Sequence, residues 1–551
     1  MFKGHPKGLY VAFFANMGER FGFYTMMAIL VLFLQAKYGL SAKEAGSIYS
    51  TFYFAIYGLA LLGGILADVT GKLMRTILAG LIIMFLGYAL MAVPGFGQGV
   101  TLTALGIIAF GNGLFKGNLQ ALVGNLYEDP KYAKLRDRAF TIFYMGINIG
   151  AFFAPSAATG VRNWWLKIHG LGYNANLPQL AHGYLDGKTV DLTELQNLAN
   201  QVSSAPVTDL KAFAQHYIDV FSQGYHMAFG VAGISMVISL IIYLVLNKYL
   251  RQGDIAGRKK EELPSTMQDI SPRETRERLI ALGLVFVTVI FFWMAFHQNG
   301  LTLTLFARDY VREHVSRWSY IFFDLRSFLP LIFAIIGVIT MFNRSATSKV
   351  RFGGASLAVA SLIVLYFVVQ GFQDQMPIEP ELFQHFNPIF IVFLTPVVVW
   401  FFGWLDKKGK EPSTPRKIAI GMFLASIAYM LLVIPSLHLP APNVIGAGGS
   451  PERISEQWLI STYFILTIAE LFLSPMGISF FSKVAPPKMK GSMQGVWLGA
   501  TAVGNLLLQV GTFFWERLEL WQVWMIFIAV TILSGLFIVS IMKKLERVAG
   551  S

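Results

Sequence analysis

The chain has 551 residues, of which 55% are hydrophobic and only 14% are charged, with a formal net charge of +13. A soluble domain usually carries about a quarter charged residues, so this composition excludes an ordinary soluble protein. There is no cysteine, which excludes disulfides, thiolate zinc sites and iron–sulfur clusters. The first apolar run is too long for the core of a signal peptide, so we expect it to remain as a membrane span.

Apolar runs long enough to cross a bilayer recur along the whole chain. Windows of roughly 19 residues give about 14 candidate spans. Their approximate centres are Val31, Ile56, Ile83, Phe110, Gly150, Ser235, Ile290, Ile335, Leu362, Val397, Ala425, Leu466, Thr501 and Ile532. The sequence therefore predicts an all-α polytopic membrane protein.

Basic residues gather in alternate loops between these spans. The loops and tails on one side hold Lys3, Lys7, Lys72, Arg75, Lys131, Lys134, Arg136, Arg138, the linker 248–278, and the segments 344–351, 407–417, 483–490 and 543–547. Such loops face the cytoplasm under the positive-inside rule, so both termini are predicted to be cytoplasmic. This distribution also accounts for the basic charge without a nucleic-acid partner.

Two long polar segments divide the chain. Residues 1–249 are predicted to form a first six-helix bundle with a polar outside loop at about 161–225, which contains a short amphipathic stretch around residues 195–220. A charged cytoplasmic linker follows at 250–277. Residues 278–551 are predicted to form a second six-helix bundle, with two extra spans at about 327–372 inserted as a hairpin. Two such halves are typical of secondary transporters.

Few ionisable residues lie inside the predicted spans: Glu19, Arg20, Lys116, His297 and Glu470. Intramembrane charges are costly, and they usually serve function and have partners. Glu19 and Arg20 are adjacent, so their side chains should leave a helix about 100° apart and reach different neighbours. Pro475, just after Glu470, is predicted to break its helix and expose carbonyl groups to a cavity. The alternative is a set of structural salt bridges within the bundle.

Several short motifs follow one another in a recognisable order. They are FFANMGERFGFYTMMAIL (13–30), GGILADVTG (63–71), GNGLFKGN (111–118), FYMGINIGAFFAP (143–155), NPIF (387–390), AELFLSPMG (469–477) and GVWLGATAVGN (495–505). In this order they resemble the proton-coupled oligopeptide transporters of the major facilitator superfamily, over nearly the whole chain. The resemblance implies the fold of that superfamily, two six-helix halves, in the cytoplasmic (inner) membrane of a bacterium.

The resemblance also implies a function, which is import of di- and tripeptides by proton symport through alternating access. The proton gradient would be the energy source, with no cofactor and no enzymatic activity, and the protein would work as a monomer. The implied substrate-binding residues are Arg20, Tyr24, Lys116, Asn148, Trp293, Asn387, Glu470 and Trp497, with Tyr53 and Tyr57 as further pocket candidates. The implied proton-coupling residues are Glu19, Lys116, His297 and Glu470, and Asp68 would act in the cytoplasmic gate. For each aromatic residue, ordinary helix packing is an equal alternative.

Four positions depart from the family pattern. Asn16 and Phe23 replace a carboxylate and a tyrosine of the first-helix motif, Met27 replaces an arginine, and His297 replaces an acidic residue. In the family, that arginine and that acid pair between the two halves. Losing both together avoids stranding a buried charge. His297 titrates near physiological pH, so it is a candidate substitute proton site, or else a neutral hydrogen-bonded core histidine.

Other functions are not favoured by the sequence. There is no GxxxxGK[ST] motif for ATP, and no HExxH or GxSxG motif for hydrolysis. A channel would need a continuous polar pore, whereas the charges form one central cluster. Two alternatives stay open: a carrier of another small zwitterionic or anionic solute, and a peptide facilitator whose proton coupling is weakened.

Overall fold

The computed structural model describes residues 4–254, 271–486 and 489–550. Within these ranges, 14 helices are long and apolar enough to cross a membrane. Each of the 14 predicted span centres falls inside one of them. Helices dominate because the hydrocarbon core offers backbone groups no water, so each span must satisfy its own hydrogen bonds. The predicted fold class is confirmed.

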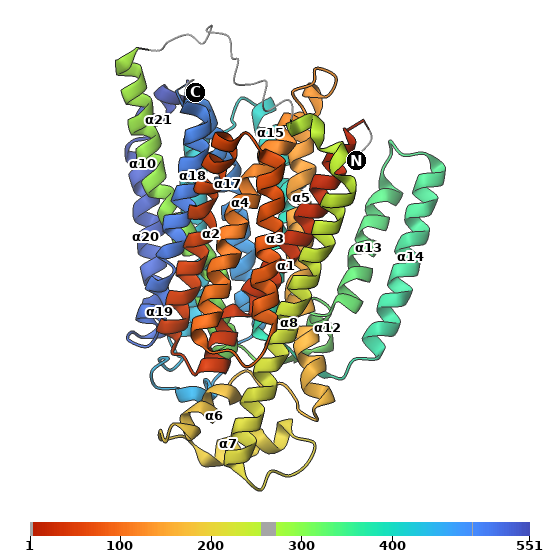
Figure 1. Cartoon of the computed structure of the whole chain (residues 1–551), viewed down its shortest axis with the longest axis vertical. Helices are drawn as coiled ribbons and strands as arrows, with labels where there is room; N and C mark the ends of the chain where they lie inside the picture. The colour runs from red at the N-terminus through yellow and green to blue at the C-terminus, as the bar shows by residue number, and fades with distance from the viewer. Residues whose placement is uncertain (1–3, 255–270, 487–488, 551) are drawn as a thin grey trace.

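The first half of the chain forms one bundle in which α1 lies against α5 and α8, while α4 lies against α2 and α3. Both termini lie at one end of the molecule, which we call the terminal end (Figure 1). The helices of this half are α1 (Lys7–Tyr38), α2 (Ala42–Thr70), α3 (Leu73–Ala92), α4 (Gln98–Asn125), η1 (Ala133–Leu135), α5 (Arg136–Ile168), α8 (Leu210–Leu246) and η2 (Asn247–Tyr249).

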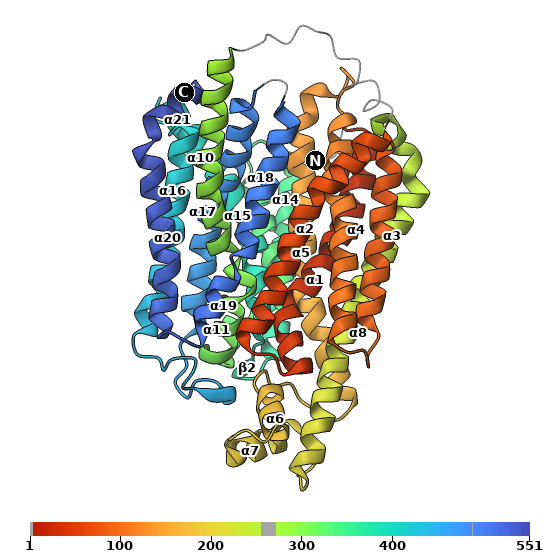
Figure 2. The same cartoon turned by 60° about the vertical axis from the view of Figure 1, so that its left-hand side comes forward.

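The second half repeats this arrangement, because α10 lies against α18 and α20, while α17 lies against α15 and α16. Figure 2 shows the two bundles side by side. The helices of this half are α10 (Pro272–Phe296), η3 (His297–Gly300), α11 (Thr302–Tyr310), η4 (Pro380–His385), α15 (Phe386–Lys407), α16 (Thr414–Ser436), η5 (Gly446–Gly448), α17 (Glu456–Val484), α18 (Lys490–Leu506), α19 (Gln509–Trp515), α20 (Leu520–Ser540) and α21 (Met542–Ala549).

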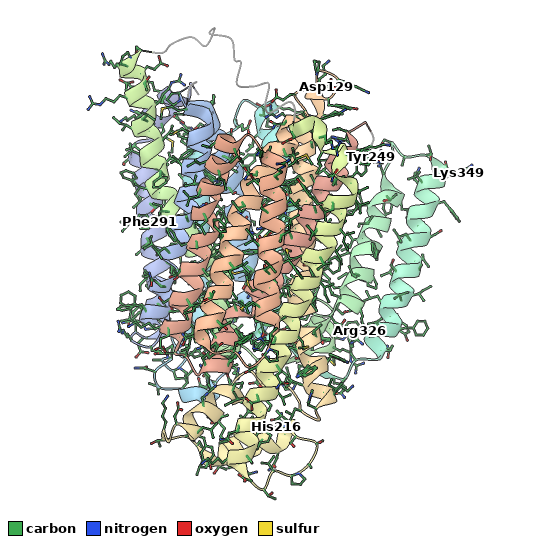
Figure 3. All side chains as sticks on the ribbon, viewed as in Figure 1. Asp129, His216, Tyr249, Phe291, Arg326 and Lys349 are labelled. Atoms are coloured by element: carbon green, nitrogen blue, oxygen red, sulfur yellow. The ribbon has the colours of Figure 1, made fainter. Side chains whose placement is uncertain are left out.

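An inserted hairpin of α13 (Leu325–Phe342) and α14 (Ser348–Gln370) stands at the edge of the bundle (Figure 1). Strands β1 (His314–Ser316) and β2 (Gln375–Pro377) pair antiparallel at its base, beside the short helix α12 (Arg317–Tyr320). Figure 3 places Lys349, near the hairpin turn, at the terminal end, and Arg326 toward the other. The strand pair returns the chain to the place where it left the bundle, so the insertion leaves the second half intact.

A small cap covers the end of the molecule opposite the termini (Figures 1 and 2). We call residues 169–209 the cap, and this end of the molecule the cap end. The cap contains α6 (Leu177–Leu185) and α7 (Leu192–Val202). Asp191 caps α7 by accepting hydrogen bonds from the backbone N–H groups of Thr193 and Glu194, as is typical of an aspartate at a helix N-terminus.

The structure corrects the predicted outside loop at 161–225. Helix α5 continues to Ile168 and α8 begins at Leu210, so only residues 169–209 lie between them. The predicted amphipathic stretch at 195–220 is also two separate helices, because α7 ends at Val202 and Pro206 lies in the gap before α8. Asp209 caps α8 through the N–H groups of Lys211 and Ala212. Residues 255–270 of the predicted linker lie outside the described residues.

The prediction for Pro475 was wrong. Helix α17 runs without interruption from Glu456 to Val484, with Pro475 inside it. Proline lacks one N–H donor, but a membrane helix tolerates this loss where neighbouring groups and small local adjustments compensate it. Glu470 therefore projects from a continuous helix.

Helices α2 and α4 approach closely at a pair of glycines. A Cβ added to Gly63 would lie 2.1 Å from the carbonyl oxygen of Gly113, and a Cβ added to Gly113 would lie 2.7 Å from the backbone of Leu59. By contrast, a Cβ on the neighbouring Gly64 would meet nothing within 4 Å. Small residues of this kind allow membrane helices to pack backbone to backbone.

We expect Gly63→Ala to destabilise the protein and Gly64→Ala to leave it unchanged or slightly more stable. The added methyl group at residue 63 must push two backbones apart, and overpacking of this kind typically costs about 1–3 kcal/mol. Thermal unfolding of the purified protein in detergent measures the difference. Equal melting temperatures for the two variants would contradict the close packing of α2 and α4.

Candidate functional site

A cavity of about 260 Å³ lies between the two halves. It is lined from the first half by α1, α2, α4 and α5 and from the second by α10, α15, α17 and α18. Its lining includes the predicted residues Arg20, Tyr24, Tyr53, Tyr57, Lys116, Asn148, Trp293, His297, Asn387, Glu470 and Trp497. Residues of these eight α-helices, and of η3 and η4, thus converge on one small space, which is typical of a ligand site.

Glu19 and Arg20 bind each other, contrary to our expectation that each would reach a different neighbour. Nε and Nη2 of Arg20 donate to the two carboxylate oxygens of Glu19 at 2.5 and 2.6 Å. Asn112 Nδ2 also donates to Glu19 Oε1, at 2.7 Å. The long arginine side chain can fold back, and two opposite charges attract each other strongly at low dielectric. Arg20 lines the cavity, whereas Glu19 is fully buried behind it.

Lys116 and Glu470 line the cavity from opposite halves. The ammonium group of Lys116 lies 3.5 Å from the centre of the Tyr57 ring, a cation–π contact. Asn387 Nδ2 donates to Glu470 Oε2 at 3.0 Å and to Thr467 Oγ1 at 3.1 Å. Neither Lys116 nor Glu470 takes part in a salt bridge among the described residues. The cavity thus presents the amine of Lys116 and the carboxyl of Glu470 from opposite halves, and the two groups are not paired with each other.

His297 is held by an aromatic stack and one hydrogen bond. Its ring lies 4.8 Å from those of Trp293 and Tyr53, centre to centre. Nδ1 lies 2.5 Å from the side-chain amide of Asn505, so one hydrogen bond joins the two side chains. The hydrogen bond expected of a core histidine is present, and a role of His297 in proton transfer stays a prediction.

Three of the remaining predicted residues, Asn148, Trp293 and Trp497, line the central cavity, whereas Asp68 does not. Asn148 donates from Nδ2 to the carbonyl of Tyr144 at 3.1 Å, and the Trp497 ring lies directly over Gly477. Trp293 Nε1 has no hydrogen-bond partner among the described residues, although it is buried beside the cavity. Asp68 lies in the last turn of α2, is exposed, and does not line the cavity. A gate role for Asp68 stays a prediction.

The family departures in α1 are buried. Phe23 lies under the guanidinium group of Arg20, at 4.7 Å from its ring centre, and Met27 is 3% exposed within the apolar core. Asn16 is also buried, and its Nδ2 finds no hydrogen-bond partner in the described ranges. An apolar side chain at residue 27 fits this environment without a charged partner.

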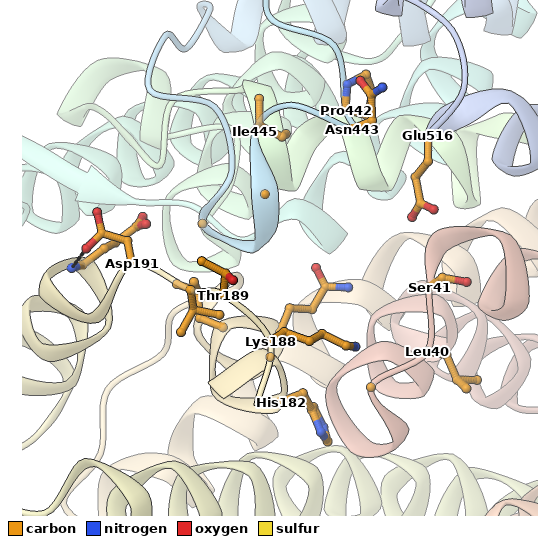
Figure 4. A pocket seen from close by; sticks show the side chains of 18 of the residues that line it. Leu40, Ser41, His182, Lys188, Thr189, Asp191, Pro442, Asn443, Ile445 and Glu516 are labelled. Atoms are coloured by element: carbon orange, nitrogen blue, oxygen red, sulfur yellow. Dashed lines mark hydrogen bonds between the residues drawn. The ribbon is translucent and has the colours of Figure 1, made fainter. Parts of the chain in front are cut away.

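A second, larger cavity of about 770 Å³ lies at the cap end. Figure 4 shows it between the cap, with His182, Lys188 and Asp191, and the outer segments that carry Asn443 and Glu516. Burial and the charge of Asp191 raise the pKa of the nearby Glu194 carboxyl. This vestibule is open and its polar groups are spread over its walls, so it lacks the converging buried charges of the central cavity. Among the described residues, no group of three or more His, Asp or Glu side chains could hold a metal ion.

Two buried charge pairs were missed by the sequence analysis. Arg162 on α5 binds Glu381 on η4, and both side chains have no exposed surface. Arg308 binds Asp309 at 2.7 Å and also donates to Gln35 Oε1 of α1 at 2.7 Å. Arg162 falls in the predicted outside loop at 161–225, and Arg308 and Asp309 lie in the last turn of α11, at the boundary of a predicted span.

Within the described residues, the hydrogen bonds that join the two halves all lie toward the cap end. Gln384, which lines the central cavity, donates to the carbonyl of Ala28 at 3.1 Å. Beyond it lie the bonds of Arg308 to Gln35, of Arg162 and Tyr225 to Glu381, of Asn163 to Glu379, of Asn176 to Gly448 and of Ala42 to Glu516. At the other end of the cavity, the lining residue Ile478 is 46% exposed. The structure is therefore closed at the cap end.

Two pseudo-symmetric bundles around a central cavity with buried charges define a secondary transporter. The family model described as "POT family" matches residues 74–261 and 359–518, which is more than half of the chain. The protein belongs to the POT family, which is the family whose motifs it resembles.

Named relatives and solved structures agree with this assignment. The chain is 28% identical over 534 residues to the peptide transporter YePEPT of Yersinia enterocolitica, covering 92% of this chain and 87% of that protein. It is 25% identical over 528 residues to the dipeptide and tripeptide permease A of Escherichia coli K12, covering 91% and 83%. A POT family transporter solved with 5-aminolevulinic acid shares the fold, with a TM-score of 0.67 at 22% identity, covering 99% of this chain and 98% of that one.

Proposed function

We propose that this protein imports di- and tripeptides across the cytoplasmic membrane of a bacterium by proton symport. The observation that carries the proposal is the unpaired cation and anion, Lys116 and Glu470, facing one cavity from opposite halves. A zwitterionic peptide has a carboxylate for the first and an ammonium for the second, and such charged hydrogen bonds are roughly twice as strong as neutral ones. The names of the relatives support the same substrate class.

Proton coupling would use the same carboxylate. An ionised carboxylate out of water is costly unless a positive charge compensates it. A proton supplies that charge to Glu470, and the protonated carboxyl keeps a carbonyl oxygen that accepts a hydrogen bond from the peptide ammonium, so proton and peptide can bind together. The paired Glu19 and the hydrogen-bonded His297 are further candidate proton sites, and the basic loops favour cytoplasmic termini, so the cap would face the outside. No cofactor is needed for such a cycle. A single chain supplies both walls of the cavity, which fits a working monomer.

The experiment that tests the substrate class is competition against labelled dialanine in exchange across proteoliposomes. Unlabelled dialanine should compete fully, whereas its N-acetylated and C-amidated forms should each compete about tenfold or more weakly, because each loses one charged hydrogen bond worth about 1.5–3 kcal/mol. Equal competition by all three would contradict recognition of both termini. If a small compound with a single charged group, such as a simple anion, competes as well as dialanine, the result would favour the alternative of a carrier for another small solute.

A further inference from the structure

The buried pair of Arg162 and Glu381 joins the two halves at the cap end. Arg162 lies near the end of α5 in the first half, and Glu381 lies in η4 at the start of the tenth span, in the second half. Neither side chain has any exposed surface. Arg162 is about seven turns of helix from the start of α5, so the pair is far from the terminal end. No residue of the pair lines the central cavity.

Several polar groups surround this pair, and they also come from both halves. Tyr225 of α8 donates to Glu381 Oε1 at 3.3 Å, and Asn163 Nδ2 donates to Glu379 Oε1 at 2.6 Å. The guanidinium group of Arg162 lies 3.8 Å from the ring centre of Tyr173 in the cap. We call Arg162, Asn163, Tyr225, Glu379 and Glu381 the outer cluster.

The position of the outer cluster has a consequence for alternating access. If the two halves separate at the cap end to admit substrate, the cluster must divide, because its members belong to different halves. A closed cap end buries both charges, and an open cap end returns both to water. Neither state leaves a single charge stranded, so the cluster allows both states while the pair is intact.

We propose that the Arg162–Glu381 pair is the outer gate of this transporter. This inference rests on the proposed alternating access but not on the identity of the substrate. Removing either partner alone leaves the other charge buried and unpaired in the closed state, which is strongly destabilising. The protein relieves this charge by opening at the cap end. Removing both partners leaves no buried charge unpaired, so it shifts the equilibrium between the closed and the open cap end far less.

The natural chain has no cysteine, so a single introduced thiol reports on opening. Thr304 of α11 is fully buried and lies just outside the cavity, where it hydrogen-bonds to Gln384. Thr304→Cys would be labelled in intact cells by a membrane-impermeant maleimide only while the cap end is open. In this background, Arg162→Gln and Glu381→Gln are each expected to raise the labelling rate by about tenfold or more.

The double variant Arg162→Gln with Glu381→Gln should label at a rate close to that of Thr304→Cys alone. The charge exchange Arg162→Glu with Glu381→Arg should label at a rate between that of Thr304→Cys alone and those of the single variants. Glu313→Gln is the matched control, because Glu313 pairs with Arg453 at the same end but within the second half, at 2.7 Å; it should leave labelling unchanged. If both single variants lower the melting temperature without changing the labelling rate, the pair only stabilises the fold and the gate proposal is wrong. Labelling needs no substrate, so failure of peptide transport would leave this result standing.

Discussion

Replacing Lys116 by glutamine is expected to lower dialanine uptake by about 10- to 100-fold, mainly through a higher KM. Glutamine keeps most of the length of the side chain but removes its charge. The ammonium group lies over Tyr57 and faces the cavity, and no carboxylate forms a salt bridge with it among the described residues. Losing a charge-assisted hydrogen bond to the peptide carboxylate costs about 1.5–3 kcal/mol, which corresponds to that change in affinity.

The matched control for this variant is Lys37→Gln. Lys37 lies in α1, is half-buried against His226, and does not line the cavity. It should change uptake by less than about twofold, as expected of a residue away from the site. Equal losses in both variants would show that any lost charge in the bundle impairs transport, and the assignment of Lys116 to the substrate carboxylate would then be wrong.

Replacing Glu470 by glutamine is expected to abolish accumulation driven by a proton gradient while exchange of peptide continues. Glutamine has the same shape as glutamate and keeps the contact with Asn387, but it cannot gain or lose a proton. A gradient of one pH unit is worth about 1.4 kcal/mol per proton, or a tenfold accumulation, so the wild-type protein should concentrate dialanine severalfold. The variant should only equilibrate it.

Glu456→Gln provides the matched control, because Glu456 is a buried carboxylate on the same helix, α17, but does not line the cavity. Its accumulation should match the wild type. Should Glu470→Gln still concentrate dialanine against a gradient, the proton must be carried elsewhere. Glu19 and His297 would then be the residues to neutralise next, singly and together.

Much of the fold follows from hydrophobicity. Apolar runs of span length must form helices in a bilayer, and this constraint placed the spans around Gly150, Ser235 and Ile335 before any contact was known. The loop at 161–225 was misjudged because Arg162 and the polar residues after it resemble solvent-exposed sequence, whereas α5 and α8 both continue past the apolar run. Hydropathy alone does not separate a polar helix end from a loop.

The candidate site was largely predictable because charges inside membrane spans are rare and costly. Lys116, Glu470 and Arg20 could be named for that reason, and the structure brings all three to one cavity. The pairing of Glu19 with Arg20 was not predictable from helix geometry, since a flexible arginine can fold back. Arg162 and Glu381 could not be found either, because their burial arises from contact between segments 219 residues apart.

The central claim is best tested by uptake of labelled dialanine into proteoliposomes, measured without a gradient and with a proton gradient imposed in each direction. Our account predicts that dialanine accumulates inside the proteoliposomes when the outside is more acidic and equilibrates without a gradient. With the gradient reversed, its concentration inside should stay below that outside. Equilibration under all three conditions would contradict proton coupling and would identify a peptide facilitator. No uptake of dialanine under any of them would contradict the proposed substrate.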